Sequence, residues 1–521
     1  MPPSTVSPRA KHWSRSKFMY ISKREMFCYS LLAIFTALWA GAFSLLGMDL
    51  HHDGIMFKAA VDVAAGKWVF KEVFCQYGIL SPLLQGGLLR IFGNELIVLK
   101  LGTAVFYAGI VVLNDLLWRR FLRVPFRVLN LVMFFVLAPY LMVPFHIWSS
   151  VYALFFMLLA AEFMLLGEER EKKLFFFLSG ICTALVFGFR WPCGVVTLFA
   201  QLAASVISAR CRKSAPQNSI KNTGVLLSGT GVILALYALY LTIGNAWQDC
   251  FRQIFSFVGK FAWERGGSGS IVNLFETFFP HTQTIDFIFA FIPAAVIILF
   301  FYSCRKFFSA PQSMEKDIPL ITLLLFGLAA YHQYYPVPCV RHLYWGAVPM
   351  MGAYALVIQR FCSSERLEKY KKVLYVFLLI LPLLWGGFWR MYSGFYRISE
   401  LFTRQSVSLP GVRGIRQGRG EQYICQIASE IRSRTRSVFN YTADGIWSVV
   451  LPEASGFNHP MFVNWQQDVY KDYPDAALSY IDRYRPAVLS SVPFFHTAYI
   501  KAGEFEYMGV TYTLWIPRFG F

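Results

Sequence analysis

The sequence predicts an all-α polytopic membrane bundle of about eleven transmembrane helices, followed by a small C-terminal α/β domain. Two observations support the bundle. The 521-residue chain is 56% hydrophobic and 18% aromatic, and its apolar residues gather in runs close to the roughly 20 residues that cross a bilayer. A third observation separates the tail, because the long apolar runs give way to charged sequence with Pro and Gly after residue 391.

The apolar runs define the expected spans in chain order. They lie at 26–47, 95–118, 126–143, 147–166, 174–190, 192–209, 222–243, 283–303, 318–335, 343–359 and 372–390. With a cytoplasmic N-terminus, the expected inner segments hold 25 Lys and Arg and the expected outer connections hold 9. Short cytoplasmic loops carry the excess of positive charge. The protein is therefore expected in a plasma membrane, as in a bacterial inner membrane, with its C-terminal domain extracytoplasmic.

Three regions follow from this topology. Residues 1–25 form a basic cytoplasmic segment, residues 26–391 form the membrane domain, and residues 392–521 form the extracytoplasmic domain. In the last region the periodicity predicts both helices and short strands. The helices are expected at 421–435 and 475–484, and the strands at 437–442, 446–451, 486–491 and 512–517.

The net charge of +19 is interpreted as membrane topology together with attraction to anionic lipids. No basic patch with interleaved aromatic residues predicts nucleic acid as a partner. The ten cysteines are scattered. Four of them fall on the outer side, where either disulfides or free thiols are compatible with the pattern; these are Cys75, Cys250, Cys339 and Cys425.

The outer loop 48–94 carries the most informative sequence, because it places acidic and histidine side chains where the first span meets water. It begins MDLHHDG. The segment that Asp53 and Gly54 open, which closes at Gly66, has an apolar stripe and predicts a helix lying flat on the membrane. Lys58 and Asp62 are expected on its wet face. The run 81–93 is expected to lie on or dip into the bilayer.

These patches resemble the GT-C superfamily of polytopic glycosyltransferases, and in particular the branch of the protein O-mannosyltransferases and the lipid A aminoarabinose transferase. Three patches carry the resemblance: the acidic loop with its FKEVFCQYG sequence (70–78), GFRWPCG (188–194), and YYPVPCVRHLYW (334–345). There is one departure. Many members of that branch have Asp-Glu where this chain has His52-Asp53, so one or two carboxylates act here, with Asp49 as the second.

The resemblance implies transfer of a sugar, with inversion, from a polyprenyl-phosphate donor to a lipid, glycan or protein acceptor. Asp53 is the expected general base, since a hydroxyl nucleophile needs a proton acceptor; it is equally a good helix N-cap. Asp49 is either a base or an anchor at the end of the span. His51 and His52 either bind a divalent metal or are polar loop residues; no cofactor is otherwise expected.

The leaving lipid phosphate calls for positive charge and hydrogen-bond donors. Arg190 and Arg341 lie at the outer ends of spans and suit bidentate phosphate contacts, although a turn anchor and a snorkelling arginine are the respective alternatives. The other candidates for the donor phosphate are Gln76, Tyr77, Lys58 and His342.

Two other functions are compatible with the sequence. A transporter or flippase for a lipid-linked or small polar substrate predicts polar residues at mid-bilayer depth and an internal repeat, neither of which is evident. A non-catalytic scaffold for envelope polysaccharide assembly treats the acidic loop as packing. The sugar, the acceptor and the prenyl length are not encoded in any recognisable pattern.

Overall fold

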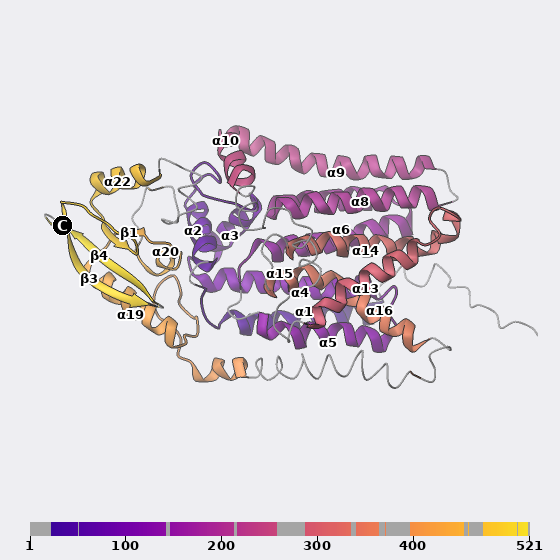
Figure 1. The fold of residues 1–521 in the computed structure, drawn as a ribbon, viewed down its shortest axis with the longest axis horizontal. Coiled ribbons are helices and arrows are strands. Elements are labelled where there is room, and N and C mark those ends of the chain that lie inside the picture. Colours follow the sequence, from indigo (N-terminus) through magenta and orange to yellow (C-terminus); the bar gives the residue numbers. More distant parts are fainter. Residues whose placement is uncertain are drawn as a thin grey trace, which may run out of the picture.

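The structure is a computed structural model. It describes residues 22–49, 52–141, 146–212, 216–257, 287–334, 340–363, 370, 396–452, 457, 473–507 and 509–518. Long helices run side by side along the long axis of the molecule, and a small sheet lies beyond one end of the bundle (Figure 1).

The bundle helices follow the apolar runs of the sequence, except that the run expected as one span at 343–359 is divided between two helices by a 3₁₀ turn at Val348–Met350. They are α1 (Lys23–Ser44), α4 (Leu96–Trp118), α5 (Val124–Leu141), α6 (Ser149–Arg170), α7 (Lys173–Phe189), α8 (Trp191–Cys211), α9 (Pro216–Ile243), α13 (Phe287–Cys304), α14 (Ile318–Tyr331), α15 (Val340–Ala347) and α16 (Met351–Cys362). Within the described residues, α1, α4, α6, α8 and α9 are long and apolar enough to cross a membrane. The protein is therefore an integral membrane protein. The expected span 372–390 lies outside the described residues.

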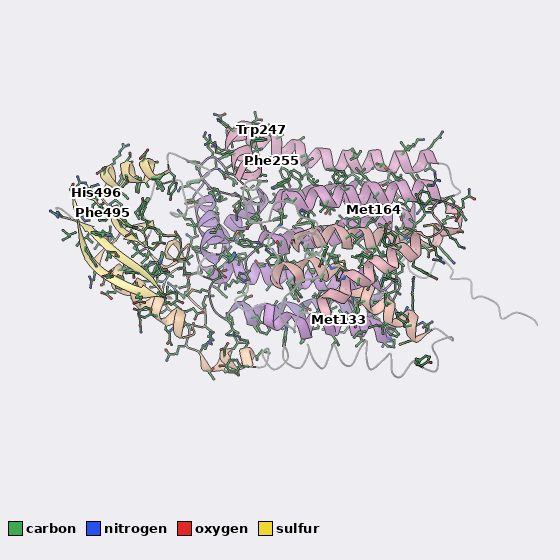
Figure 2. The ribbon with its side chains drawn as sticks, viewed as in Figure 1. Met133, Met164, Trp247, Phe255, Phe495 and His496 are labelled. Atoms are coloured by element: carbon green, nitrogen blue, oxygen red, sulfur yellow. The ribbon has the colours of Figure 1, made fainter. Side chains whose placement is uncertain are left out.

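The bundle core is built from side chains that the helices bury between one another. Met133 of α5 and Met164 of α6 are both fully buried there and lie among the long helices in Figure 2. The helix α10 (Trp247–Phe251) follows α9, and a π-helical turn, Arg252–Phe257, continues it. Trp247 and Phe255 are exposed at this end of the bundle, where amphipathic aromatic rings suit the membrane interface.

Two short helices lie between the bundle and the sheet (Figure 1). These are α2 (His52–Ala64) and α3 (Leu80–Phe92). The first confirms the helix predicted from Asp53 to Gly66, and the second occupies the run 81–93, which was expected to lie on or dip into the bilayer. The expected wet face of α2 was wrong: Lys58 and Asp62 are buried, and Lys58 Nζ lies 2.9 Å from Asp62 Oδ1. A second cation, Lys67, lies 2.9 Å from the same oxygen. The helix is covered by protein, so its polar stripe is paired internally instead of facing water.

The C-terminal region contains a mixed four-stranded sheet in the order β1-β2-β4-β3. Its strands are β1 (Val438–Tyr441), β2 (Ala487–Ser490), β3 (Tyr499–Tyr507) and β4 (Val510–Pro517), and its helices are α19 (Arg419–Arg434), α20 (Trp447–Val450) and α22 (Tyr473–Tyr484). β1 and β2 are parallel, and the other neighbours are antiparallel. Three expected strands and both expected helices are confirmed. The strand expected at 446–451 was wrong, since α20 occupies it, and β3 was not predicted.

The C-terminal region packs directly on α2. Met56 and Phe57 of α2 share one buried cluster with Trp447 of α20 and Ile427 of α19. Contact is closest at Gly54, where an added Cβ would lie 1.9 Å from the carbonyl carbon of Gly445. This close approach fixes the start of α2, which carries the acidic loop.

Candidate functional site

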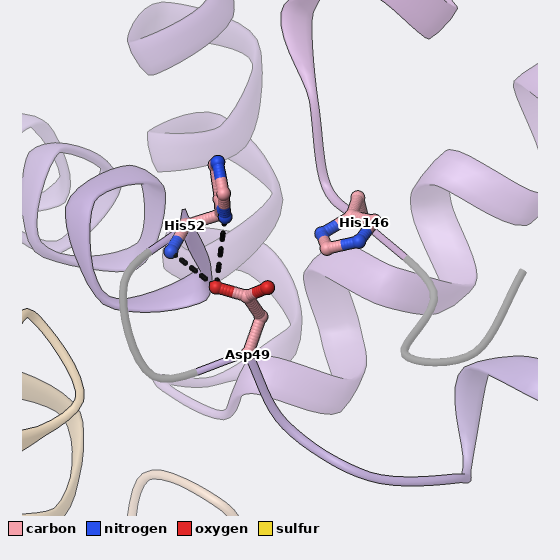
Figure 3. A group of neighbouring side chains, drawn as sticks. All are labelled: Asp49, His52 and His146. Carbon is pink, nitrogen blue, oxygen red and sulfur yellow. Dashed lines mark hydrogen bonds and ion pairs between the residues drawn. The ribbon is translucent and has the colours of Figure 1, made fainter. Parts of the chain in front are cut away.

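Asp49, His52 and His146 come together beside the start of α2 (Figure 3). One metal-ligating atom from each lies within 4.8 Å of the others. Asp49 Oδ1 accepts hydrogen bonds from the backbone N–H of His52 at 2.6 Å and lies 2.9 Å from His52 Nδ1. The other oxygen of the Asp49 carboxylate lies toward His146 in Figure 3. The cluster therefore joins the end of α1, the start of α2 and the segment that precedes α6.

Asp49 is held as a carboxylate. Burial alone would raise the pKa of Asp49. Other groups outweigh burial and lower the pKa well below its ordinary value: the side-chain hydrogen bond and the charge of His52, the charge of His146, and the backbone N–H of His52. The residue is nonetheless partly accessible, with 15% of its side chain exposed. An ionised, accessible carboxylate is what a proton acceptor or a metal ligand requires.

Asp53 has a different environment, because its side chain is fully buried. Its Oδ2 lies 3.0 Å from Lys100 Nζ of α4 and accepts a 2.9 Å hydrogen bond from the backbone N–H of Asp49. Burial raises the pKa of Asp53, while Lys100 and the Asp49 N–H oppose the rise. Lys100 also donates to the Gly47 carbonyl at 2.8 Å. The pair thus ties α4 to both ends of the segment that carries Asp49.

Arg190 and Tyr77 come together at the C-terminal end of α7, as their two sequence patches suggested. The Arg190 guanidinium lies 5.3 Å from the centre of the Tyr77 ring, in the range of a cation–π contact. Its Nη1 donates to Ser150 Oγ at the start of α6. The Trp191 N–H donates to the Tyr77 carbonyl at 3.2 Å. Burial raises the pKa of Tyr77 to about 12, although Arg190 opposes the rise, so the phenol stays a neutral donor.

Two glycines explain this approach. An added Cβ on Gly78, next to Tyr77, would lie 2.3 Å from the Gly188 carbonyl oxygen. Gly188 stands directly before Phe189 and Arg190. Only a residue without a side chain at position 78 therefore lets the loop that carries Tyr77 reach the end of α7. His332, at the end of α14, also lies near Arg190.

Trp148 connects the acidic cluster with the arginine. Its ring lies 4.8 Å from His52 on one side and 4.9 Å from Tyr77 on the other, both with edge-to-face geometry. Asp49, His52, Trp148, Tyr77 and Arg190 therefore form one continuous line of contacts. The line runs along the end of the bundle nearest the C-terminal region.

The remaining expected site residues are placed as follows. Gln76 is buried beside Tyr77. Lys58 is buried and paired with Asp62, so it belongs to the α2 packing. His342 lies in α15 with its ring centre 5.4 Å from that of Trp345. Arg341 is in the same helix, and its side chain lies outside the described part of the structure, as does all of His51.

Two residues that the geometry brings to the site were not among the candidates chosen from the sequence. These are His146 and Lys100. Both had a detectable signal. Lys100 is a charge within the apolar run LIVLKLGTAVF, and ionisable residues in spans are functional candidates by default. His146 stands at the outer end of the expected span 147–166, on the same side as the acidic loop.

The Asp49, His52 and His146 set fits a divalent metal. One carboxylate and two imidazoles are ligands that Zn²⁺ and other first-row divalent ions accept, and three protein ligands leave positions open. When no metal ion is bound, the same atoms of Asp49 and His52 form the hydrogen bond described above.

Comparison with known proteins places the fold. Neither a protein-family model nor a curated protein matches the sequence. Among solved structures, the chain is similar to the oligosaccharyltransferase of Archaeoglobus fulgidus in its apo form, with a TM-score of 0.52 and 12% identity over 90% of this chain and 70% of that chain. The chain therefore has a fold similar to that of this oligosaccharyltransferase over most of its length.

Proposed function

We propose that this protein transfers a sugar from a polyprenyl-phosphate donor to an acceptor, with inversion, at the end of the bundle that faces the C-terminal region. The observation that carries the proposal is the line of contacts from Asp49 to Arg190. It places an ionised carboxylate and a guanidinium at the same end of the bundle, in a fold similar to that of a transferase. A lipid phosphate and an acceptor hydroxyl need these two groups.

In this proposal Asp49 replaces Asp53 as the general base. A hydroxyl must come within hydrogen-bond reach of the base. The carboxylate of Asp53 is fully enclosed and its Oδ2 is occupied by Lys100 and the Asp49 N–H. Asp49 is accessible and ionised. Asp53 and Lys100 serve as positioning residues, because they hold the backbone of Asp49.

The reaction forms a bond from the acceptor oxygen to the anomeric carbon and breaks the bond from that carbon to the phosphate oxygen. The acceptor proton passes to the Asp49 carboxylate, and the prenyl phosphate leaves with the electron pair of the broken bond. Arg190 binds the departing phosphate oxygens, and the Tyr77 ring and Ser150 hold the guanidinium in place.

A divalent cation fits the proposal at Asp49, His52 and His146. When bound, it would supply positive charge for the phosphate of the donor. His52 and His146 also keep the carboxylate ionised without it, since both lower its pKa.

We assign the family branch, the membrane and the role of the C-terminal domain from the sequence patches. We place the protein beside the protein O-mannosyltransferase and aminoarabinose transferase branch, in a bacterial inner membrane, with residues 392–521 as an extracytoplasmic domain. The closeness of Gly54 to Gly445 supports a role for that domain in shaping the acceptor side of the site.

Mass spectrometry of lipids that co-purify with the full-length protein tests the proposal. We expect a glycosylated prenyl phosphate with the wild type and about a tenfold smaller amount with Arg190→Gln, since charged hydrogen bonds contribute about 1.5–3 kcal/mol. Arg210→Gln is the matched control, because Arg210 lies at the opposite end of α8, over Phe307. Absence of any prenyl phosphate, or equal amounts with Arg190→Gln, would reject the donor assignment.

A further inference from the structure

A polar cavity of about 300 Å³ opens at the other end of the bundle, away from the C-terminal region. It lies among the ends of four helices: the last turns of α6 and α8 and the first turns of α7 and α9, which meet far from the sheet in Figure 1. Three of these helices, α6, α8 and α9, are long and apolar enough to cross the membrane. The ends of such helices lie at the depth of lipid headgroups, so the cavity faces that layer.

Three cations line the cavity, each from a different element. Lys173 begins α7, Arg212 ends α8 and Lys221 lies in the second turn of α9. Both lysines are exposed, and Arg212 is partly buried. The first turns of α7 and α9 add the positive ends of two helix dipoles. This half of the lining suits a phosphate, and basic pockets between spanning helices bind phosphorylated headgroups.

Two carboxylates line the same cavity, at the end of α6. Glu171 is exposed and takes the left-handed conformation that stops the helix, with φ 55°. Glu168 is more than nine-tenths buried and lies 3.7 Å from Arg212. Its Oε2 is the atom that lies 3.7 Å from Arg212 Nη2, an ion pair too long to be a hydrogen bond, and it accepts no hydrogen bond from the residues that the structure describes. Burying a carboxylate oxygen without a donor is costly, so this half of the lining calls for a hydrogen-bond donor, and a cation best of all.

We propose that this cavity binds the headgroup of a membrane lipid in which a phosphate is joined to a primary amine, as in phosphoethanolamine. The phosphate faces Lys173, Lys221 and Arg212, and the ammonium faces Glu168 and Glu171. A primary ammonium has three N–H donors, which satisfy the orphaned oxygen of Glu168. A quaternary ammonium has none, and a headgroup without an amine leaves Glu168 Oε2 with its ion pair to Arg212 but no hydrogen-bond donor. The site is separate from the proposed transferase centre and does not depend on it.

Native mass spectrometry of the full-length protein tests this site, with phosphatidylethanolamine, phosphatidylcholine and phosphatidylglycerol of identical acyl chains offered in turn. We expect about tenfold preference for phosphatidylethanolamine over phosphatidylcholine, the difference in affinity that a charged hydrogen bond supplies. Equal binding of the two zwitterionic lipids, or stronger binding of phosphatidylglycerol, would overturn the proposal.

Variants separate the two halves of the site. Lys173→Gln with Lys221→Gln removes two exposed cations and should lower phosphatidylethanolamine and phosphatidylcholine binding alike. Glu171→Gln should reduce the preference between them only in part, because Glu168 still accepts from the ammonium, and should leave phosphatidylcholine binding unchanged. Arg210→Gln is the control, since Arg210 belongs to the same helix end but does not line the cavity. An equal loss of binding with Arg210→Gln would mean that surface charge, not the cavity, attracts the lipid.

Competition with soluble ligands separates a lipid from a free phosphate. Inorganic phosphate and free phosphoethanolamine should displace the lipid only weakly, because the acyl chains anchor the headgroup beside the cavity. Full displacement by either soluble compound at the lipid's own concentration would contradict a lipid site and indicate a site for a soluble phosphate.

Discussion

Lys100 Nζ lies 3.0 Å from Asp53 Oδ2, and both side chains are fully buried. The contact joins a membrane-spanning helix to the first turn of α2, and the same carboxylate oxygen accepts the backbone N–H of Asp49. The acidic group that is most prominent in the sequence is therefore structural in its contacts. Its neighbour Asp49 is the one that the fold presents to the site.

Breaking this pair should destabilise the protein strongly. Asp53→Asn leaves the Lys100 ammonium buried without its partner, and removing one member of a buried pair costs about 3–5 kcal/mol. The double variant Asp53→Leu with Lys100→Met should be less destabilised than the sum of the two single variants. Thermal unfolding in detergent measures this. Single variants as stable as the wild type would show that the pair does not hold the loop.

Gly54→Ala should lower both stability and activity, because the new methyl group would collide with the backbone of Gly445. The matched control is Gly87→Ala in α3, where an added Cβ meets nothing within 4 Å; it should be neutral or slightly stabilising, since alanine favours a helix over glycine. Melting temperatures of the two variants compare the sites directly. If both behave alike, the contact between α2 and the C-terminal region is not tight.

The Tyr77 ring should hold the Arg190 guanidinium in place by a cation–π contact with the face of the ring. Tyr77→Phe keeps the ring and should change donor affinity by less than about threefold, whereas Tyr77→Leu removes a contact of about 0.5–2 kcal/mol and should weaken donor binding by about 2- to 30-fold. Titration of the co-purified glycolipid onto delipidated protein gives both affinities. A larger loss with Tyr77→Phe than with Tyr77→Leu would point to the phenol hydroxyl instead.

Metal binding should depend on His146. His146→Ala removes one of three ligands and should lower the affinity for Mn²⁺ or Zn²⁺ at least tenfold in isothermal titration. His496→Ala is the control, because His496 is bonded to Asp482 in the C-terminal region. Unchanged affinity with His146→Ala would place the metal elsewhere.

The spanning helices could be predicted because length and hydropathy define them, and their bounds lie within a few residues of the apolar runs. The C-terminal elements were harder. The segment IWSVVL is equally consistent with a strand or a helical turn, since a short apolar run has no decisive period. The missed β3 has exposed charged positions such as Lys501 and Glu504, and its pairing with β4 decides its structure.

The choice between Asp49 and Asp53 was not accessible from the sequence. The two carboxylates stand four residues apart in one loop, and both suit a base by type. What separates them is tertiary: Lys100 approaches from α4, and Gly445 closes over Gly54 from the C-terminal region. Local patterns carry neither contact. The meeting of Tyr77 and Arg190 was easier to predict, because both patches were expected on one side of the membrane.

The rate of sugar transfer by Asp49→Asn, measured with the co-purified glycolipid as donor and normalised to folded protein, tests the central claim most directly. We predict a loss of about 10²- to 10⁴-fold, with the melting temperature near that of the wild type. Folded Asp53→Asn should retain far more activity per molecule. Transfer by Asp49→Asn within a few-fold of the wild-type rate would contradict the account.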